Sequence, residues 1–235
     1  MTRRRWIADE VEGNRAALTG SHAAHLARVL RTSVGQEFDI ATGQEIRMGR
    51  VVSVSDERVE FDLGAIVDTG RTTHPIRVAL AVFKFDRFEW AVEKCTELGV
   101  AEVVPLIARR TDSHLAAAAP KRLERWQRIA REASQQSRRE RVPEIATPLK
   151  LKQYLAQENS SRRILLAENE QQVLLRDLIS GDAETTLAIG PEGGWTEEEV
   201  GMFASCGWQS ASLGNTILRA ETAAIAAVAI LVSKY

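Results

Sequence analysis

The sequence predicts an α/β protein with two parts, a small β-rich region and a larger domain built on a mostly parallel sheet. Beyond the first third of the chain, short apolar runs typical of strands alternate with segments of helical periodicity, and this alternation favours a parallel sheet covered by helices. Before that point, short β-rich runs are separated by turn residues, as in a small barrel. The chain has 235 residues, 44% of them hydrophobic, which is enough to bury one large core or two small ones.

The N-terminal part is predicted to be a domain of residues 1–70. It contains one short helical segment, 21–30, with apolar residues at Leu26, Val29 and Leu30. The β-rich runs that follow are 37–41, 45–54 and 58–66.

The predicted linker is 67–75, which contains Asp68-Thr69-Gly70 and ends in His74-Pro75. Residues 71–235 are therefore predicted to form the second domain. Its strand-like runs are 76–83, 103–107, 163–167, 185–189 and 209–213. Its clearest helices are 86–98, which stops at Gly99, and 120–139, which begins with Pro120.

Composition and local sequence disfavour several classes of protein. The basic N-terminus is not followed by an apolar stretch, and the longest apolar run, 223–232, is too short to cross a membrane. We therefore expect a cytoplasmic protein that does not enter the membrane. Cys95 and Cys206 lack a Cys-x-x-Cys spacing or a paired histidine, so we expect two reduced packing residues and no metal site.

Charge is distributed unevenly along the chain. The net charge of −1 argues against a protein that coats nucleic acid without selectivity. Residues 121–141, however, contain eight basic residues and three acidic ones. Within them Arg125, Arg128 and Arg131 recur at intervals of three and share one side of a helix. This stretch is either a solvated helix face or a strip that contacts phosphates, and both interpretations stay open.

A glycine-rich stretch at 188–196 is the strongest local sign of a binding site. Gly193-Gly194 presents backbone amides without side chains, and Gly190 before Pro191 ends the strand that precedes it. The stretch lacks both the Walker pattern and the dinucleotide-binding G-x-G-x-x-G pattern, and it carries a carboxylate, Glu192. A neutral or cationic ligand therefore fits better than a phosphate, and a purely structural tight turn is the alternative.

The residues after this stretch indicate the start of a helix. Thr196 and Glu199 have the spacing of a capping box, in which the two side chains satisfy each other's backbone amides. The acidic run 197–199 then suits the positive end of the helix dipole.

Three consecutive predicted strands end in polar or glycine-containing loops. The loops begin with Ala167-Glu168-Asn169, Gly190-Pro191-Glu192 and Leu213-Gly214-Asn215. In open parallel sheets, ligands bind outside the carboxyl ends of the strands. We therefore expect the three loops to form one site.

The segments Gly190–Gly194, Leu213-Gly214 and Ile217–Ala223 together resemble the C-terminal half of the SPOUT knotted methyltransferases, specifically the 16S ribosomal RNA (uracil-N3) methyltransferase family. The resemblance covers the whole chain. Further segments that resemble this family are 25–31, 93–100, 109–111 and 136–139.

The resemblance implies a fold, a cofactor and a reaction. It implies a PUA-like RNA-binding domain in residues 1–70 and a trefoil knot at about 163–235, a rare exception to the rule against threaded chains. It further implies that S-adenosylmethionine is bound by the loops and that its methyl group goes to N3 of a uridine in 16S ribosomal RNA. The small ribosomal subunit is the implied partner, and the last helix, 220–235, is the implied homodimer interface.

Individual residues take their expected roles from the same resemblance. Arg219 is the candidate for stabilising the uracil anion. The expected cofactor-binding residues are Leu166, Ala167, Gly190, Glu192, Gly193, Gly194, Leu213, Gly214, Ile217 and Leu218. The expected RNA-binding residues are Arg4, Arg28, Arg31, Arg109, Arg110 and Arg139, although Arg28 and Arg31 are equally consistent with capping the last turn of their helix. Glu221 either pairs with Arg219 or anchors the last helix, and no general base is identified.

Some positions depart from the family pattern. Asn215 and Thr216 stand where the family usually has Pro and Arg, Gln135 where it has Glu, and Arg138 where Gly is common. The alternatives are therefore another SPOUT enzyme, acting on a ribose 2′-hydroxyl or on transfer RNA, and a non-catalytic RNA-binding factor in ribosome assembly. A nucleotide-binding enzyme with an acidic loop is a more distant alternative.

Overall fold

The computed structural model describes residues 4–68, 75–179, 181 and 183–233. These residues divide into two compact units. The first consists of the described part of Met1–Thr72 together with Ser134–Val142, and the second of the described part of Thr73–Ala133 and Pro143–Tyr235. The predicted linker lies mostly outside the described residues. Residues 134–142, which the sequence prediction assigned to the second domain, group with the first unit.

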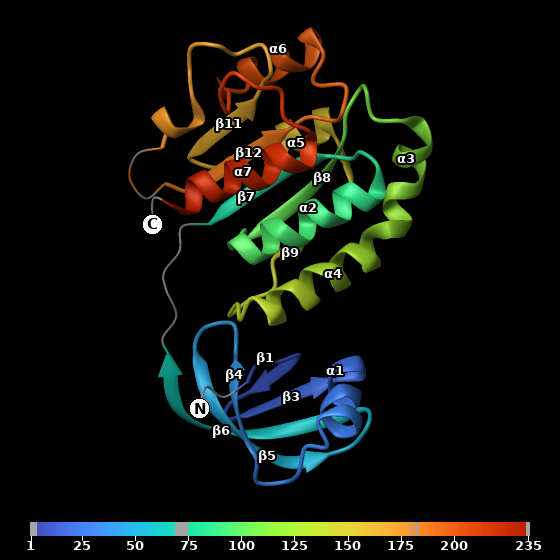
Figure 1. Ribbon diagram of the computed structural model, residues 1–235, viewed down its shortest axis with the longest axis vertical. Coiled ribbons are helices and arrows are strands. Elements are labelled where there is room, and N and C mark those ends of the chain that lie inside the picture. Colours follow the sequence, from blue (N-terminus) through green and yellow to red (C-terminus); the bar gives the residue numbers. More distant parts are fainter. Residues whose placement is uncertain (1–3, 69–74, 180, 182, 234–235) are drawn as a thin grey trace. The chain divides into compact units, whose positions relative to one another are not determined.

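A six-stranded sheet forms the first unit (Figure 1). Its strands, in the order β1-β4-β5-β6-β3-β2, are β1 (Arg5–Ile7), β4 (Glu37–Ala41), β5 (Ile46–Val54), β6 (Arg58–Asp68), β3 (Arg15–Thr19) and β2 (Glu10–Glu12). The β1–β4 pairing is parallel and the others are antiparallel. The three predicted β-rich runs are confirmed as β4, β5 and β6. Strands β1, β2 and β3 were missed, because they depend on pairing with strands elsewhere in the sheet.

The core of this unit forms where the sheet curves over its helical segment. Helix α1 (Gly20–Ala24) continues into a π-helical turn, His25–Val29, in place of the predicted helix 21–30. Leu26 from this segment is fully buried with Ile40 and Phe61. A Cβ atom on Gly49 would lie 2.3 Å from Ile40 Cγ1, so glycine is required where β5 crosses this core.

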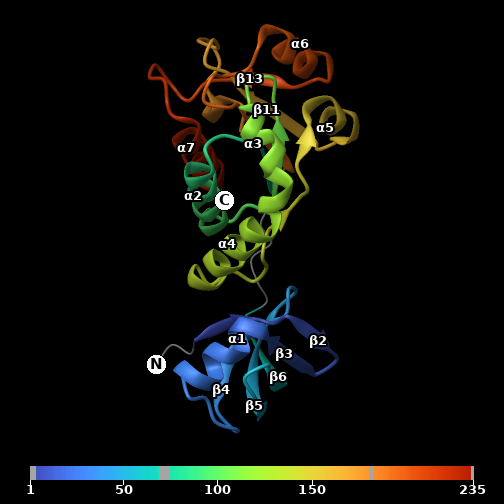
Figure 2. The ribbon, with the colours of Figure 1, turned by 90° about the vertical axis from the view of Figure 1, so that its right-hand side faces the viewer.

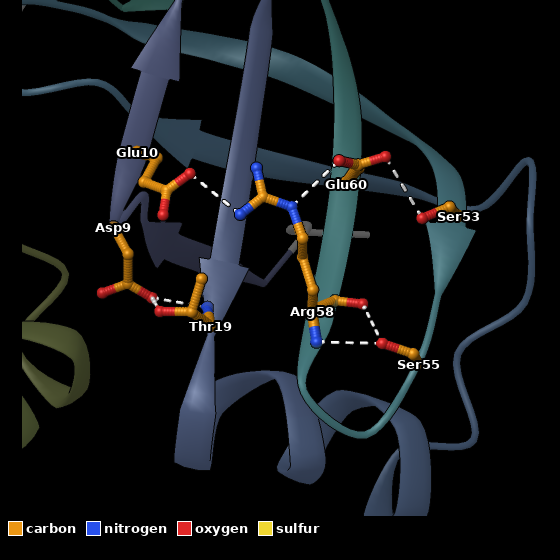
Figure 3. Close-up of polar contacts among 7 residues, drawn as sticks. All are labelled: Asp9, Glu10, Thr19, Ser53, Ser55, Arg58 and Glu60. Carbon is orange, nitrogen blue, oxygen red and sulfur yellow. Dashed lines mark hydrogen bonds and ion pairs between the residues drawn. The ribbon is translucent and has the colours of Figure 1, made fainter.

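Polar contacts join the outer strands of the sheet (Figure 3). The Arg58 guanidinium on β6 donates to Glu10 on β2 at 2.8 Å and to Glu60 at 2.9 Å. The Asp9 carboxylate accepts a hydrogen bond from the Thr19 amide at 2.7 Å. Because Arg58 and Glu10 are about half exposed, these pairs contribute little to stability and mainly fix the register of the edge.

The second unit is built on a sheet of seven strands in which every described pairing is parallel. The order is β10-β8-β7-β12-β11-β13, with β9 beside β8. The strands are β7 (Ile76–Ala81), β8 (Glu102–Ile107), β9 (Glu144–Ile145), β10 (Leu149–Lys150), β11 (Arg162–Leu166), β12 (Thr185–Ile189) and β13 (Gln209–Ala211). The predicted α/β class with a mostly parallel sheet is confirmed.

Helices cover both faces of this sheet (Figures 1 and 2). Helices α2 (Phe85–Leu98) and α7 (Ala220–Val232) lie side by side on one face, and α5 (Leu151–Gln157) lies on the other. The α5 face buries an aromatic cluster of Tyr154, Phe203 and Trp208. The remaining helices are α3 (Ser113–Ala118), α4 (Leu123–Gln136) and α6 (Glu197–Ser205). No helix in the described part of the chain is long and apolar enough to cross a membrane.

Charged side chains gather at the amino ends of the strands. Arg77 on β7 contacts Glu102 on β8 at 3.2 Å and Glu184, just before β12, at 2.8 Å. Nearby, the Tyr154 hydroxyl donates to Glu158 at 2.8 Å, and burial is the main reason that the pKa of Tyr154 is raised. This edge is therefore held by ion pairs and hydrogen bonds among residues far apart in sequence.

The helix predicted at 120–139 is shorter in the structure. A 3₁₀ turn at Ala119–Arg122 precedes α4, which ends at Gln136. The chain turns at Arg138, whose φ of 58° is in the left-handed region that favours glycine. The Arg138 carbonyl accepts a hydrogen bond of 2.9 Å from the Arg5 guanidinium, which holds this conformation in place.

We predict that Arg138→Gly stabilises the protein by about 0.5–1 kcal/mol, because the left-handed strain on a side chain exceeds the extra backbone entropy that glycine loses. The Arg138 side chain is exposed, and the hydrogen bond from Arg5 goes to the backbone carbonyl, so the bond is retained. Urea unfolding measures the change. Arg128→Gly, inside α4, is the matched control and should cost about 1 kcal/mol. A loss of stability in both variants would contradict the interpretation.

Candidate active site

A pocket of about 1080 Å³ opens at the carboxyl edge of the parallel sheet in the second unit. Its walls are the segments that follow β7, β11, β12 and β13, with Arg110 from the loop after β8. All ten residues expected to bind the cofactor line this pocket, and so does Arg219. Residues from three separate loops are thus brought together, as the position of the strand ends predicted.

The glycine stretch after β12 forms a tight turn at the pocket wall. The Gly194 amide donates to the Pro191 carbonyl at 2.8 Å, and Gly194 has a φ of 70°, which a side chain would strain. A Cβ on Gly190 would lie 3.2–3.3 Å from the ring of Trp195. Gly190 is therefore small because the indole packs directly against its backbone.

Trp195 was not singled out by the sequence analysis. Its ring packs edge-on against Phe203 of α6, with centroids 4.9 Å apart. The indole Nε1 is buried without a hydrogen-bond partner and the residue lines the pocket. The indole nitrogen lies against the bare backbone of Gly190, so its donor is enclosed by the protein.

Glu199 fixes the start of α6. The predicted capping box is confirmed, with the Glu199 carboxylate accepting from the Thr196 amide at 2.9 Å and Thr196 Oγ1 accepting from the Glu199 amide at 3.2 Å. The other carboxylate oxygen accepts from the Arg109 amide at 2.7 Å. Glu199 is 4% exposed, so one buried carboxylate joins the loop after β8 to the loop after β12.

Arg110 also holds the glycine loop. Its Nη1 donates to the Gly193 carbonyl at 2.5 Å and to the Trp195 carbonyl at 3.4 Å. A Cβ on Gly193 would lie 3.3 Å from Arg110 Cδ, so the arginine side chain packs against the bare backbone of the loop. The side chain that was expected to meet RNA thus lies on the wall of the pocket.

Lys84 and Arg87 line the pocket and were missed by the sequence analysis. Arg87 Nη1 donates to Glu192 Oε1 at 2.8 Å, and Arg87 Nε lies 3.8 Å from Glu221 Oε1. Glu221 was expected either to pair with Arg219 or to anchor the last helix. In the structure it lies beside Arg87, a contact that ties the start of α7 to α2. Ligands bind outside the carboxyl ends of parallel strands, and Lys84 and Arg87 follow β7 at its carboxyl end. The same rule therefore could have identified both residues from the sequence.

The loop from Leu213 to Arg219 contains the departures from the family pattern. Its start is held by backbone hydrogen bonds, because Ser212 donates to Val173 and accepts from Leu175, both at 2.9 Å. Asn215 and Thr216 are exposed and line the pocket, and Ile217 is 82% exposed. Arg219, also exposed, is the N-cap residue of α7 in an extended conformation, and its guanidinium makes no capping bond.

Of the other residues expected to contact RNA, Arg109 is exposed in the loop after β8 of the second unit, and the rest belong to the first unit. Arg4 is exposed, and Arg28 pairs with Asp56 at 2.6 Å, a contact that lowers the pKa of that carboxyl. Arg31 has a φ of 50°, so it marks the bend after the helical segment. Arg139 is half-buried, and this burial lowers the pKa of its guanidinium to about 10.

Part of the basic stretch in 121–141 has a structural role. Arg125 Nε lies 2.7 Å from Glu89 Oε1 on α2, and Arg122 Nη1 lies 3.6 Å from the same atom. The Arg122 guanidinium also lies over the Phe85 ring, 4.6 Å from its centroid. These two arginines therefore satisfy a buried carboxylate, which favours the helix-face interpretation at their positions.

Both cysteines are free thiols. Cys95 is buried in α2, and burial raises the pKa of its thiol to about 12, so the reactive thiolate is disfavoured. Cys206 is a free, partly buried cysteine. In the described ranges, no group of three or more His, Cys, Asp or Glu side chains is placed to hold a metal ion.

Comparison with known proteins identifies the family. Residues 71–232 match the family model described as an RNA methyltransferase domain. The chain belongs to this family. It is 33% identical to "Ribosomal RNA small subunit methyltransferase E" of Synechocystis, over 90% of this chain and 71% of that protein. The protein of the same name from Bacillus subtilis is 30% identical over 90% of this chain and 87% of its own length. The resemblance found in the sequence is thereby confirmed.

Two solved structures extend the similarity to the whole fold. A methyltransferase from Legionella pneumophila, in complex with the bound cofactor SAM, has a TM-score of 0.86 and 27% identity, covering 100% of this chain and 98% of that one. The ribosomal RNA small subunit methyltransferase E from Neisseria gonorrhoeae, bound to S-adenosyl methionine, has a TM-score of 0.85 and 25% identity with the same coverage.

We predict that Glu199→Ala destabilises the protein by about 2 kcal/mol, because it removes charge-assisted hydrogen bonds to two backbone amides in a buried site. Glu198→Ala is the matched control: its side chain is exposed in the same first turn, and its loss should cost about 0.3 kcal/mol through the helix dipole. Thermal and urea unfolding measure both. Equal effects of the two substitutions would show that Glu199 acts only through the dipole.

Proposed function

We propose that the protein transfers a methyl group from S-adenosylmethionine to N3 of a specific uridine in 16S ribosomal RNA of the small ribosomal subunit. The observation that carries this proposal is the single pocket in which the three expected loops meet, in a chain of the RNA methyltransferase family. Relatives named ribosomal RNA small subunit methyltransferase E support the substrate class. Such an enzyme works in the cytoplasm, where ribosomal subunits are assembled.

The residues of the pocket fit this cofactor. Carboxylates of Glu168 and Glu192 line it, and they suit a ligand that carries a sulfonium cation. Gly193 lines the pocket without a side chain, so its backbone amide offers a donor for a neutral heterocycle. The cofactor supplies, when bound, a methyl group that a nucleophile can accept. The residues of this chain bind it, orient it and exclude water from it.

The chain must also make uracil a nucleophile. N3 of uracil carries a proton that has to leave before the nitrogen can attack, so an environment that stabilises the uracil anion lowers the barrier. Arg219 lines the pocket and its side chain is exposed, which supports this role for it. The uridine must be presented from a loop of the RNA or flipped out of a helix.

We also propose a trefoil knot, two domain assignments and a set of RNA contacts. The pairing of Ser212 with Val173 and Leu175 supports a trefoil knot at about 163–235, because it holds the chain after β13 against the segment between β11 and β12. Residues 1–70 are assigned as a PUA-like RNA-binding domain and 71–235 as the methyltransferase domain. Arg4, Arg28, Arg31, Arg109, Arg110 and Arg139 are the proposed RNA contacts.

A homodimer is proposed through α2 and α7. A groove of about 440 Å³ runs between these helices, lined by apolar residues that include Trp90, Leu98 and Ile225. Trp90 is 47% exposed, and Val232 near the end of α7 is 36% exposed. An exposed tryptophan beside a row of small and branched apolar residues is typical of a protein interface.

The test is a methyl-transfer assay on small ribosomal subunits from a strain that lacks the modification. The protein is incubated with labelled S-adenosylmethionine, and the RNA is digested and analysed by mass spectrometry. Label in 3-methyluridine is the expected result. Label in a ribose-methylated nucleoside would assign the sister activity, and cofactor binding without transfer would favour a binding factor. A parallel incubation with transfer RNA tests the other substrate, and label in that incubation alone would change the substrate.

We predict that Arg219→Ala lowers kcat by about 100-fold while the Kd of S-adenosylmethionine changes little, because the lost guanidinium acts on the charge that develops on uracil. Single-turnover kinetics and calorimetry measure the two quantities. Arg176→Ala is the matched control, since this arginine is 71% exposed in the same unit and does not line the pocket. A rise in Kd that accounts for the whole loss would assign Arg219 to cofactor binding.

A further inference from the structure

Arg87 occupies a position in the pocket that the proposed reaction does not yet use. It lies in the first turn of α2 and contacts carboxylates from two other segments. Its Nη1 donates to Glu192 Oε1 at 2.8 Å, and its Nε lies 3.8 Å from Glu221 Oε1. The three side chains are 31%, 37% and 6% exposed in the order Arg87, Glu192 and Glu221. One cation therefore serves two carboxylates of unequal burial.

The contact with Glu192 limits what that carboxylate can offer a ligand. Glu192 lines the pocket and belongs to the glycine loop. While Arg87 donates to it, its charge is partly neutralised, and a cationic ligand gains less from approaching it. The availability of the Glu192 charge thus depends on where the Arg87 guanidinium lies.

Glu221 offers Arg87 a second position. Its carboxylate is almost fully buried, and its Oε2 has no hydrogen-bond partner. A buried carboxylate oxygen without a donor carries a desolvation penalty that a guanidinium N–H relieves. Arginine has five donors in a planar fork, so Arg87 can close on Glu221 when it gives up Glu192.

We propose that Arg87, shared between Glu192 and Glu221, sets the preference of the pocket for a cationic sulfonium cofactor over its neutral thioether product. A ligand with positive charge at sulfur competes for Glu192 and moves Arg87 toward Glu221, whereas a neutral sulfur does not compete. Arg87 is then a positioning residue that acts through Glu192. This inference rests on the proposed cofactor.

Calorimetric Kd values for S-adenosylmethionine and S-adenosylhomocysteine test the proposal, because their ratio isolates the charge at sulfur. Arg87→Gln should raise the preference for the sulfonium about threefold to fivefold, since it frees the Glu192 carboxylate. Glu192→Gln should lower the preference by a similar factor. The double variant should match Glu192→Gln alone. If Arg87→Gln raises the ratio equally in the Glu192→Gln background, Arg87 acts by direct repulsion and the proposal is wrong.

Two further variants test whether the Arg87 guanidinium moves to Glu221. Glu221→Gln should lower the preference for the sulfonium, because Arg87 then keeps its contact with Glu192. Arg87→Lys should act in the same direction, since a lysine ammonium can hold Glu192 but cannot span both carboxylates. If both variants keep the wild-type ratio of the two Kd values, Arg87 is not shared between Glu192 and Glu221 and the proposal is wrong. The lysine variant also keeps the test informative if Arg87→Gln does not fold.

Arg77→Gln is the matched control. Arg77 is 32% exposed and lies 2.8 Å from Glu184, values close to those of Arg87 and Glu192, but at the opposite edge of the same sheet. Its loss changes the net charge equally and should leave the ratio unchanged. Thermal unfolding verifies that each variant is folded.

The outcomes separate the two levels of inference. If the wild-type protein binds neither compound, the proposed cofactor is wrong and this inference fails with it. If it binds both compounds and no variant at Arg87 changes their ratio, the inference alone fails and the proposed function stands.

Discussion

Parallel pairing of β11 with both β12 and β13 is the constraint on which the site depends. The three strands run in the same direction, so their carboxyl ends, and the loops that follow them, lie at the same end of the sheet. The strands are held there by burial as well as by backbone hydrogen bonds, because Ile164, Leu165, Leu187 and Ala188 are at most 1% exposed. The loops they carry therefore start from fixed points, and the pocket is the space that these points enclose.

The loops themselves contain few large apolar side chains, and charged groups hold them in place. Glu199 joins the loops after β8 and β12, Arg110 holds the Gly193 carbonyl, and Arg87 joins Glu192 to the start of α7. Charge-assisted hydrogen bonds to backbone are directional and comparatively strong when shielded from water. They fix the glycine loop from its flanks, and Arg87, Arg110 and Glu192 at the same time line the pocket.

The arginines of this chain show why residue type alone does not reveal a role. Arg122 and Arg125 satisfy the buried Glu89, and Arg110 lies along the glycine loop. Arg138 occupies a left-handed backbone position where its side chain is a disadvantage, and Arg139 is partly withdrawn from solvent. A guanidinium suits phosphate, carboxylate and carbonyl oxygen alike, and only its neighbours decide which of these it binds.

The sequence by itself determined local features of the parallel domain: five of its seven strands, helix α2 with its end at Gly99, the capping box at Thr196 and the loops that follow three of the strands. These depend on residues close together in the chain, whose periodicity and backbone preferences act whatever lies around them. The short strands β1 to β3 and the early end of α4 were not predictable in this way, because they depend on pairing partners and on one strained residue.

The tertiary structure alone decided the strand order, the packing of Trp195 on Gly190 and the contacts of Arg87 with Glu192 and Glu221. Arg87 and Glu192 are 105 residues apart, and nothing in either segment specifies the other. Such pairs follow from how the sheet and its helices pack, since burial and charge act on whatever side chains the fold brings within a few ångströms. The positions of the loops therefore follow from local sequence, whereas the side-chain contacts inside the pocket follow from residues far apart in the chain.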